Sequence, residues 1–309
     1  MTQFDQVLYI ASVGYSGSTL LSMMLNQNPL VSSLGEVYLI SEHDRNNWPC
    51  TCGELLGHCR FWSPVLDDLR IKTENSALTF AQFPLTLEAK NQSIFRKIPS
   101  FADALLVLGN KLLWDSLSGL SYRSSTYART ARNARRLYDT VAAVHGTPVL
   151  VDSSKYALPL KSIYLGLRSK MKIIYLVRDG RAVTASLMSR QNLSVSQAAA
   201  KWGRFNWNLQ LVLRSVPKDQ VLTVRYEDLC RHTIETLDEI CRFSGKVSTL
   251  RGTTIMKELS HDIGGNPMRN RKQETEIVLD ETWKRRLTEN DLKIFDSHAG
   301  RMNEKFGYR

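Results

Sequence analysis

Short apolar segments that alternate with segments of helical spacing constrain the fold of this chain more than any other feature. Each apolar segment has the length of a strand, and the residues after it repeat their apolar positions every three or four places. Near-continuous apolar strands that alternate with helices predict a parallel sheet covered on both faces. The predicted strands are Val7–Val13, Thr147–Asp152, Lys172–Val177 and Gln220–Arg225. The predicted helices that follow them are Ser18–Leu25, Ser153–Arg168, Gly180–Arg190 and Thr233–Phe243.

The strand pattern stops between Phe61 and His145, where Phe101–Leu117 and Tyr122–Val144 have helical spacing. We therefore expect a helical insertion at residues 61–145. After Leu259 come a glycine loop and a last predicted helix at Thr282–Ala299. Because no repeat or low-complexity linker divides the chain, we predict one three-layer α/β domain across residues 1–309.

The charge of the chain points to an anionic partner. Lys and Arg number 41 against 30 Asp and Glu, a net charge of +11. Such an excess is typical of proteins that bind nucleic acid, a membrane surface, or a phosphorylated or sulfated small molecule. No apolar run approaches the roughly 20 residues of a membrane span, and the N-terminus does not read as a signal peptide. Five cysteines, an odd number, favour a reducing compartment, so we expect a cytoplasmic protein.

A glycine turn joins the first predicted strand to its helix. Residues Gly14–Thr19 read Gly-Tyr-Ser-Gly-Ser-Thr. Unpaired amides and the positive end of the dipole make a helix N-terminus an anion site, and the hydroxyls of this loop add donors. The loop has no Walker A lysine, which counts against an ATPase or GTPase. An ordinary tight turn with a Ser/Thr cap is the alternative.

A second motif follows the third predicted strand. Arg178 stands at the end of that strand, and Ser186 follows eight positions later, about two turns into the next helix. Ligands of parallel sheets collect at the carboxyl ends of the strands, and an arginine fork suits phosphate oxygens. The two side chains could therefore hold a phosphate. The alternative is an ion pair of Arg178 with Asp179 or another neighbour.

Two further segments complete a set of four ordered motifs. Tyr226–Leu229 reads Tyr-Glu-Asp-Leu after a strand, and Gly264–Arg269 reads Gly-Gly-Asn-Pro-Met-Arg. Together the four resemble sulfotransferases that use 3′-phosphoadenosine 5′-phosphosulfate (PAPS), in the bacterial branch related to the tyrosylprotein and carbohydrate enzymes. The resemblance covers residues 7–60 and 147–300 in order. It implies a P-loop-like fold and in-line transfer of a sulfuryl group to a hydroxyl, with a carboxylate base and no metal.

The resemblance also implies roles for particular residues. Arg178 and Ser186 would hold the 3′-phosphate, and Tyr226 would lie near the adenine. Asn266 and Arg269 belong to the loop that closes over the 3′-phosphate. The glycine loop would bind the 5′-phosphosulfate, through Gly14, Tyr15, Ser16, Gly17, Ser18, Thr19 and Leu20.

The glycine loop departs from the family pattern at one position. Many members have Lys or Arg before the Ser-Gly-Ser/Thr-Thr segment, where this chain has Tyr15. A phenol brings no positive charge at neutral pH, so another cation must neutralise the leaving phosphate. Lys155, after the second predicted strand, is our candidate, and a solvated lysine in a helical first turn is its alternative. Glu36 is the candidate base, at the spacing of the glutamate in the tyrosylprotein branch; a surface carboxylate or a helix-capping position is its alternative.

Two clusters have several interpretations. Cys50, Cys52 and Cys59 could bind zinc, form a local disulfide, or be plain thiols near the acceptor, and the C-x-C spacing is unusual for zinc. We predict no metal. Five arginines between Arg123 and Arg136, without an acidic residue among them, could face an anionic acceptor or form a solvated helix face.

The sequence thus predicts a PAPS-dependent sulfotransferase that acts on a small-molecule, glycan or lipid hydroxyl, with anionic acceptors included. A P-loop-like kinase is the competing enzyme, although the loop lysine and a magnesium carboxylate are missing. A nucleic-acid-binding protein would explain the charge, but the chain lacks a recognisable reading motif, so we expect no nucleic acid as partner. The acceptor and the oligomeric state lie beyond the sequence.

Overall fold

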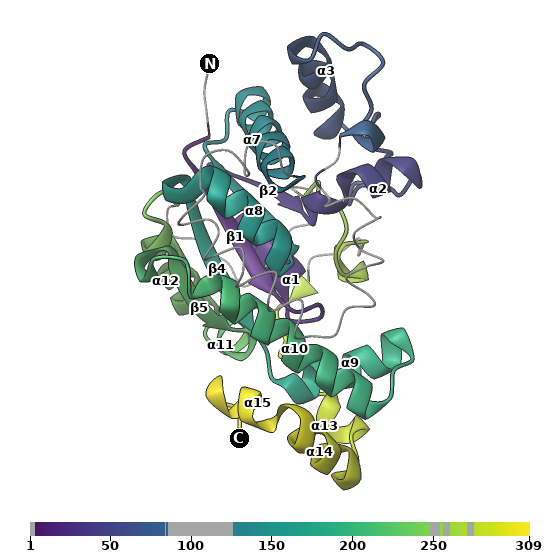
Figure 1. Cartoon of the computed structure of the whole chain (residues 1–309), viewed down its shortest axis with the longest axis vertical. Coiled ribbons are helices and arrows are strands. Elements are labelled where there is room, and N and C mark those ends of the chain that lie inside the picture. The colour runs from purple at the N-terminus through teal and green to yellow at the C-terminus, as the bar shows by residue number, and fades with distance from the viewer. Residues whose placement is uncertain (1–3, 84, 86–125, 248–253, 256–259, 271–274) are drawn as a thin grey trace.

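A five-stranded parallel sheet forms the centre of the molecule (Figure 1). The computed structural model describes residues 4–83, 85, 126–247, 254–255, 260–270 and 275–309. The strand order is β2-β3-β1-β4-β5, so β1 lies in the middle. The strands are β1 Gln6–Ser12, β2 Val31–Gly35, β3 Val149–Lys155, β4 Met171–Val177 and β5 Val221–Arg225. The predicted α/β fold, a parallel sheet flanked by helices, is confirmed.

Side chains of the buried strands point alternately to the two faces of the sheet, and they form a separate apolar core on each face. Val7, Tyr9 and Ala11 of β1 pack into one apolar cluster, whereas Leu8 and Ile10 pack into the other. Successive side chains of a strand point to opposite faces, so a strand buried on both faces is apolar throughout. This pattern explains the continuous apolar runs in the sequence.

Helices cover both faces of the sheet. α7 (Thr126–His145), α8 (Ala157–Leu167) and α10 (Val195–Leu213) contribute to the core that contains Tyr9. In Figure 1, α8 and α10 lie in front of the sheet. α1 (Ser18–Leu25) and α12 (Thr233–Ser244) contribute to the core on the other face. The three layers follow from this division.

Smaller elements surround these layers. A third apolar cluster joins α9 (Gly180–Gln191), α10 and α14 (Glu289–Phe295) through Val183, Trp202 and Phe295. The remaining helices and strands are α2 Ile40–Arg45, α3 Trp62–Lys72, α11 Tyr226–Arg231, α13 Trp283–Arg286, α15 Arg301–Lys305, β6 Thr254–Ile255 and β7 Thr275–Glu276. Single helical turns are Val37–Leu39, Phe80–Gln82, Arg168–Lys170, Lys218–Gln220, Pro267–Asn270 and Asp296–Gly300. No helix in the described ranges has both the length and the apolar character needed to cross a membrane.

The edge strand β2 was not predicted, because its sequence is half polar. Its two serines are buried and hydrogen-bonded, which removes the usual cost of burying a hydroxyl. The Ser33 hydroxyl contacts Ser22 Oγ at 2.6 Å and also donates to Asp262, and Ser32 Oγ lies 2.7 Å from Thr147 Oγ1. The serine hydroxyls of β2 therefore find their hydrogen-bond partners in residues that are distant in sequence.

Two helix predictions need correction, and one helix was missed. β3 continues to Lys155, so the helix predicted from Ser153 begins at Ala157. α10 was missed; it begins at a capping box of Ser194 and Gln197, just after α9 ends in the left-handed residue Asn192. The last predicted helix is broken because Leu287 is extended and Thr288 caps a new helix.

Part of the predicted insertion is described. Its residues up to 83 contain α3, and α7 closes it at the sheet. The predicted helix Phe101–Leu117 and Arg123 lie outside the described residues.

A buried carboxylate joins α7 to β3. Asp152 accepts hydrogen bonds from the Tyr138 hydroxyl at 2.5 Å and from the Ser154 amide at 2.8 Å. Burial raises the pKa of Asp152 to about 6, although the hydrogen bonds from Ser154 and Tyr138 oppose this shift. Because the folded protein holds this proton more tightly than the unfolded chain, the unfolding free energy contributed here falls as pH rises from the unfolded pKa toward 6.

We expect Tyr138→Phe to lower the unfolding free energy by about 1.5–3 kcal/mol, the usual worth of a hydrogen bond to a charged group. The hydrogen bond from Tyr138 favours the ionised form of Asp152. The decrease in unfolding free energy should therefore be larger at about pH 8, where this carboxylate is ionised, than at about pH 5. Urea unfolding followed by circular dichroism measures both values. Tyr164→Phe, which removes a bond to the neutral Gln220 amide, is the control. Equal losses of the Tyr138 variant at both pH values would contradict this account.

Candidate functional site

An open cleft of about 780 Å³ lies at the carboxyl ends of β1, β3 and β4. Ligands of open parallel sheets bind at this edge. The predicted site residues that line the cleft are Gly14, Tyr15, Gly17, Ser18, Thr19, Leu20, Glu36, Lys155, Arg178, Ser186, Tyr226 and Asn266. Ser16 and Arg269 do not line it.

The glycine loop presents the start of α1 to the cleft. Gly17 adopts φ +91°, and a Cβ there would lie 2.5 Å from Cδ2 of Tyr226. Only glycine therefore allows the tyrosine ring to pack on this backbone. Gly17 precedes α1 without any side-chain cap, so the first amides of the helix are available to an anion. Ser16 is buried and its amide donates to Val13 O, which closes the turn.

Arg178 follows β4 and is held on three sides. Its guanidinium lies 4.3 Å from the centre of the Tyr226 ring, and Nη1 donates to Tyr15 O at 2.9 Å. Nη2 donates to Asp280 O at 2.9 Å and pairs with the Asp280 carboxylate at 3.2 Å. Arg178 Nε is buried and has no hydrogen-bond partner among the described residues. These contacts therefore fix the orientation of the guanidinium.

The alternative ion pair of Arg178 with Asp179 is not formed. Asp179 instead caps α9 by accepting from the Arg181 amide at 2.9 Å, and it pairs with the Arg181 side chain at 2.7 Å. Ser186, on the next turns of α9, donates to Ala182 O at 3.0 Å.

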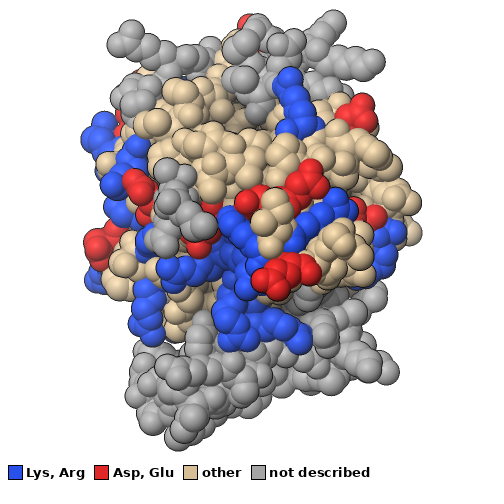
Figure 2. Space-filling view, turned by 90° about the horizontal axis from the view of Figure 1, so that it is seen from above, with Lys and Arg blue, Asp and Glu red and all other residues tan. Residues whose placement is uncertain are grey.

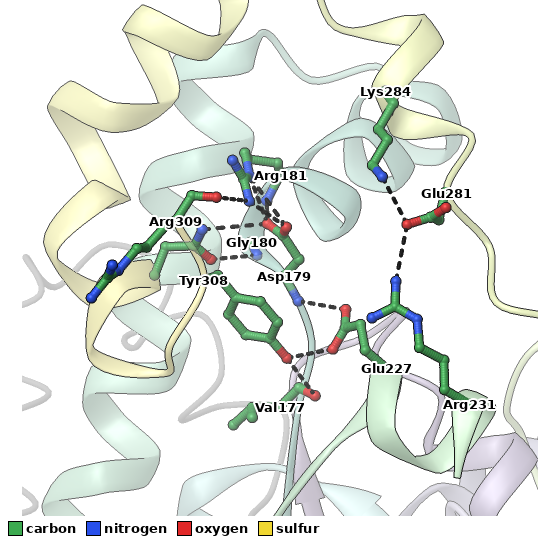
Figure 3. A network of polar contacts seen from close by, with 11 residues as sticks. Val177, Asp179, Gly180, Arg181, Glu227, Arg231, Glu281, Lys284, Tyr308 and Arg309 are labelled. Atoms are coloured by element: carbon green, nitrogen blue, oxygen red, sulfur yellow. Dashed lines mark hydrogen bonds and ion pairs between the residues drawn. The ribbon is translucent and has the colours of Figure 1, made fainter. Parts of the chain in front are cut away.

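The C-terminal segment fixes the start of α9 beside Arg178. Figure 3 shows the Tyr308 hydroxyl directed at Glu227, to which it donates at 2.5 Å. Glu227 in turn accepts from the Asp179 amide at 3.2 Å, and Arg181 donates to Arg309 O at 2.9 Å. The Asp179 backbone and the Arg181 side chain, both just after Arg178, are thus anchored by residues more than 40 positions away in sequence.

The two candidate catalytic side chains contact each other. Lys155 Nζ donates to Glu36 Oε1, and each side chain is only 11% exposed. Glu36 follows β2 and Lys155 ends β3, so parallel pairing of these strands brings the two together. Neither is a solvated surface group, and Lys155 does not lie in a helix. Lys155 adopts φ +72°, a backbone that non-glycine residues seldom adopt and that occurs often at functional sites.

The loop after residue 260 holds Glu36 and Thr19 in place. The Glu36 amide donates to Ile263 O at 2.6 Å, and Ile263 pairs with Gly35 as an extension of the sheet. The Asn266 amide donates to Thr19 Oγ1 at 3.0 Å. Arg269, which the sequence places in the same loop, donates to Asp262 O at 3.1 Å.

Sequence reasoning missed several residues of the cleft. Asp280, the partner of Arg178, stands in no recognised motif, and only the fold brings it to β4. Arg190 also lines the cleft, one turn after Ser186, and helical periodicity could have identified it. Arg286 adds a further cation from α13.

The arginines of α7 form a solvated helix face. Arg129, Arg132, Arg135 and Arg136 are exposed, whereas Leu137, Tyr138 and Val141 of the same helix are buried. None of these arginines lines the cleft. Figure 2 shows Lys and Arg gathered in a band across the middle of one face, with Asp and Glu among them.

Comparison with known proteins gives consistent results. The sulfotransferase domain family matches residues 5–307. Over 112 residues the chain is 30% identical to the protein-tyrosine sulfotransferase of Drosophila melanogaster, a stretch that covers 33% of this chain and 22% of the fly protein. The solved sulfotransferase domain from the Synechococcus PCC 7002 olefin synthase is similar across 100% of this chain and 97% of its own, with a TM-score of 0.52 and 20% identity. This similarity to the solved structure shows a shared fold.

The contact of Glu36 with Lys155 should be measurable in the unfolding free energy. We expect Glu36→Gln to lower it by about 1–3 kcal/mol, because a nearly buried ammonium loses its charged partner. The double variant Glu36→Gln/Lys155→Gln should lose less than the single one. Urea unfolding of the three proteins tests this order.

Glu281→Gln is the matched control, since it breaks exposed ion pairs with Lys284 and Arg231 and should change stability little. A double variant less stable than the single one would show that the two side chains do not compensate each other.

Proposed function

This chain belongs to the sulfotransferase family, which matches residues 5–307, and from that premise we propose that it transfers the sulfuryl group of PAPS to an acceptor hydroxyl. The observation that carries the proposal is the single cleft that combines an uncapped helix start, an oriented arginine and a paired carboxylate and lysine. A volume of about 780 Å³ is adequate for a nucleotide-sized ligand.

We assign the anionic ends of the donor to two places in the cleft. The amides at the start of α1, with the hydroxyls of Ser18 and Thr19, suit the 5′-phosphosulfate. Arg178 and Ser186 suit the 3′-phosphate, because both line the cleft and an arginine fork matches phosphate oxygens. The ring of Tyr226, held between Gly17 and Arg178, would then lie beside the adenine.

Glu36 and Lys155 would carry the chemical step. Glu36 accepts the proton of the acceptor hydroxyl. The oxygen of that hydroxyl forms a bond to sulfur, and the bond from sulfur to the 5′-phosphate oxygen breaks. Lys155 supplies the positive charge that Tyr15 does not, and it stabilises the departing phosphate together with the loop amides. The two side chains form an ion pair in a nearly closed part of the cleft, where an unpaired charge would be costly.

The acceptor would approach along Tyr156, which lines the cleft beside Lys155 and is 38% exposed. Its ring makes an edge contact with Tyr38 at 5.0 Å between centroids, so it is a fixed apolar wall. A small-molecule, glycan or lipid acceptor can pack against this ring with its hydroxyl directed into the cleft. None of the five cysteines is in a disulfide, in line with the reducing, cytoplasmic setting that we propose.

Ligand stabilisation separates this function from its competitors. At a concentration about 1,000 times its Kd, 3′-phosphoadenosine 5′-phosphate (PAP) should add about 4 kcal/mol to the unfolding free energy, without magnesium. ATP with magnesium should add far less, because the loop lacks a lysine for the γ-phosphate. Thermal unfolding with PAP, ATP and duplex DNA measures the three effects.

Arg178→Ala is the control for the donor assignment. It should remove most of the stabilisation by PAP while leaving more of that by adenosine 5′-phosphosulfate, which lacks the 3′-phosphate. Stabilisation by DNA alone would overturn the proposed function, and stabilisation by ATP with magnesium alone would favour a kinase.

Glu36→Gln should leave PAP binding intact and reduce turnover by about 10²-fold or more, since the amide cannot accept the proton. Turnover is measured with PAPS and any acceptor found by mass spectrometry of treated extracts. Glu42→Gln, in the adjacent α2, is the matched control. If Glu36→Gln turns over at the wild-type rate, Glu36 is not the base.

A further inference from the structure

Three cysteines and one histidine meet beside the loop that holds Glu36. The thiols of Cys50, Cys52 and Cys59 and the ring of His261 have their ligand atoms within 4.8 Å of one another. Cys59 Sγ lies 3.3 Å from His261 Nδ1 and 3.6 Å from Cys52 Sγ. Cys50 Sγ lies 3.8 Å from the same Nδ1. The fourth group comes from about 200 positions further along the chain, which is why the sequence offered no complete set.

Three of the separations among these four ligand atoms are close to those of a tetrahedral metal site. Zinc bonds of about 2.3 Å to sulfur and about 2.0–2.1 Å to nitrogen place neighbouring ligand atoms about 3.5–3.8 Å apart at a tetrahedral angle. The three measured separations lie near that range. Three thiols and one imidazole are a donor set typical of structural zinc.

The ligand atoms are supported by the protein around them. The ring of Phe61 stacks on His261 at 5.5 Å between centroids, and Trp62 Nε1 donates to His261 O at 2.8 Å. Turn hydrogen bonds from the Cys59 amide to Leu55 O and from the Gly53 amide to Cys50 O fold the cysteine segment on itself. Such support fixes the orientation of the donors.

One neighbour must move when a metal binds. Arg60 Nε donates to His261 Nε2 at 3.2 Å, and a ring that binds metal through Nδ1 carries its proton on Nε2. Arg60 is exposed and can turn away. Near the sulfurs, its charge would offset the net negative charge of three thiolates and one Zn²⁺.

We propose that Cys50, Cys52, Cys59 and His261 bind one Zn²⁺ ion as a structural site. Four protein ligands leave no position open for a substrate, so the ion takes no part in the transfer step. It ties the segment of residues 50–59 to the loop in which Ile263 bonds to Glu36. The proposal does not depend on the donor or the acceptor, and it replaces our sequence-based expectation of plain thiols without metal.

The test is the metal content of the untagged full chain after dialysis in a reducing buffer without added metal. We expect close to one zinc ion per chain by inductively coupled plasma mass spectrometry. Cys52→Ser and His261→Asn should each weaken zinc binding by about tenfold or more in a chelator competition. Because Cys52 is exposed, its variant should fold even if His261→Asn does not.

Two matched variants control for these changes. His58→Asn alters the histidine adjacent to Cys59 in sequence, and Cys241→Ser alters a cysteine in α12, outside the cluster. Both should keep the full zinc content. Zinc retained in His261→Asn but lost in His58→Asn would overturn the ligand assignment.

Cobalt provides a readout of geometry. Co²⁺ added to the chelator-treated protein should give the strong visible absorption of tetrahedral thiolate coordination, and Cys52→Ser should lose it. Chelation should also lower the melting temperature of the wild type more than that of Cys52→Ser. A protein that binds neither Zn²⁺ nor Co²⁺ with its thiols reduced, or that purifies with a Cys52–Cys59 disulfide, would overturn the proposal.

Discussion

Parallel pairing of all five strands sends every carboxyl end to the same edge of the sheet. The glycine loop after β1, Glu36 after β2, Lys155 at the end of β3 and Arg178 after β4 meet there although they span more than 160 residues of sequence. Each strand end contributes one kind of group, from amides to a carboxylate and two cations. The site is therefore a direct product of strand direction, and the helices outside the sheet mainly hold it in position.

Charge at this edge is balanced pair by pair. Lys155 contacts Glu36, and Arg178 contacts Asp280. Isolated charges in nearly closed positions would be costly, so Lys155 and Arg178 each keep an anionic partner until a ligand offers a better one. The net charge of +11 lies largely elsewhere, for example on the exposed face of α7, and its main effect on an anionic ligand is attraction at longer range.

The sequence predicted the structure correctly where an apolar strand or helix pattern lies next to a motif of reactive or polar residues. The apolar runs of β1 and β4 and the glycine loop are local signals, so the fold class and most of the cleft could be predicted from them. β2 could not, because its buried serines find their partners in α1 and in Asp262. Asp280 and His261 were missed for the same reason: each acts through a residue that only the folded chain brings near. Tertiary contacts, rather than weak local patterns, account for these omissions.

The contact of Tyr308 with Glu227 has a consequence for the order of events during synthesis. β4 and Arg178 leave the ribosome long before residue 308 does, so the nascent sheet can pair its strands while the start of α9 is still without this anchor. Contacts between residues far apart in sequence form late, because the intervening chain must be ordered first. A ribosome-bound intermediate whose synthesis has not reached Tyr308 would therefore contain the sheet edge without this anchor at the start of α9.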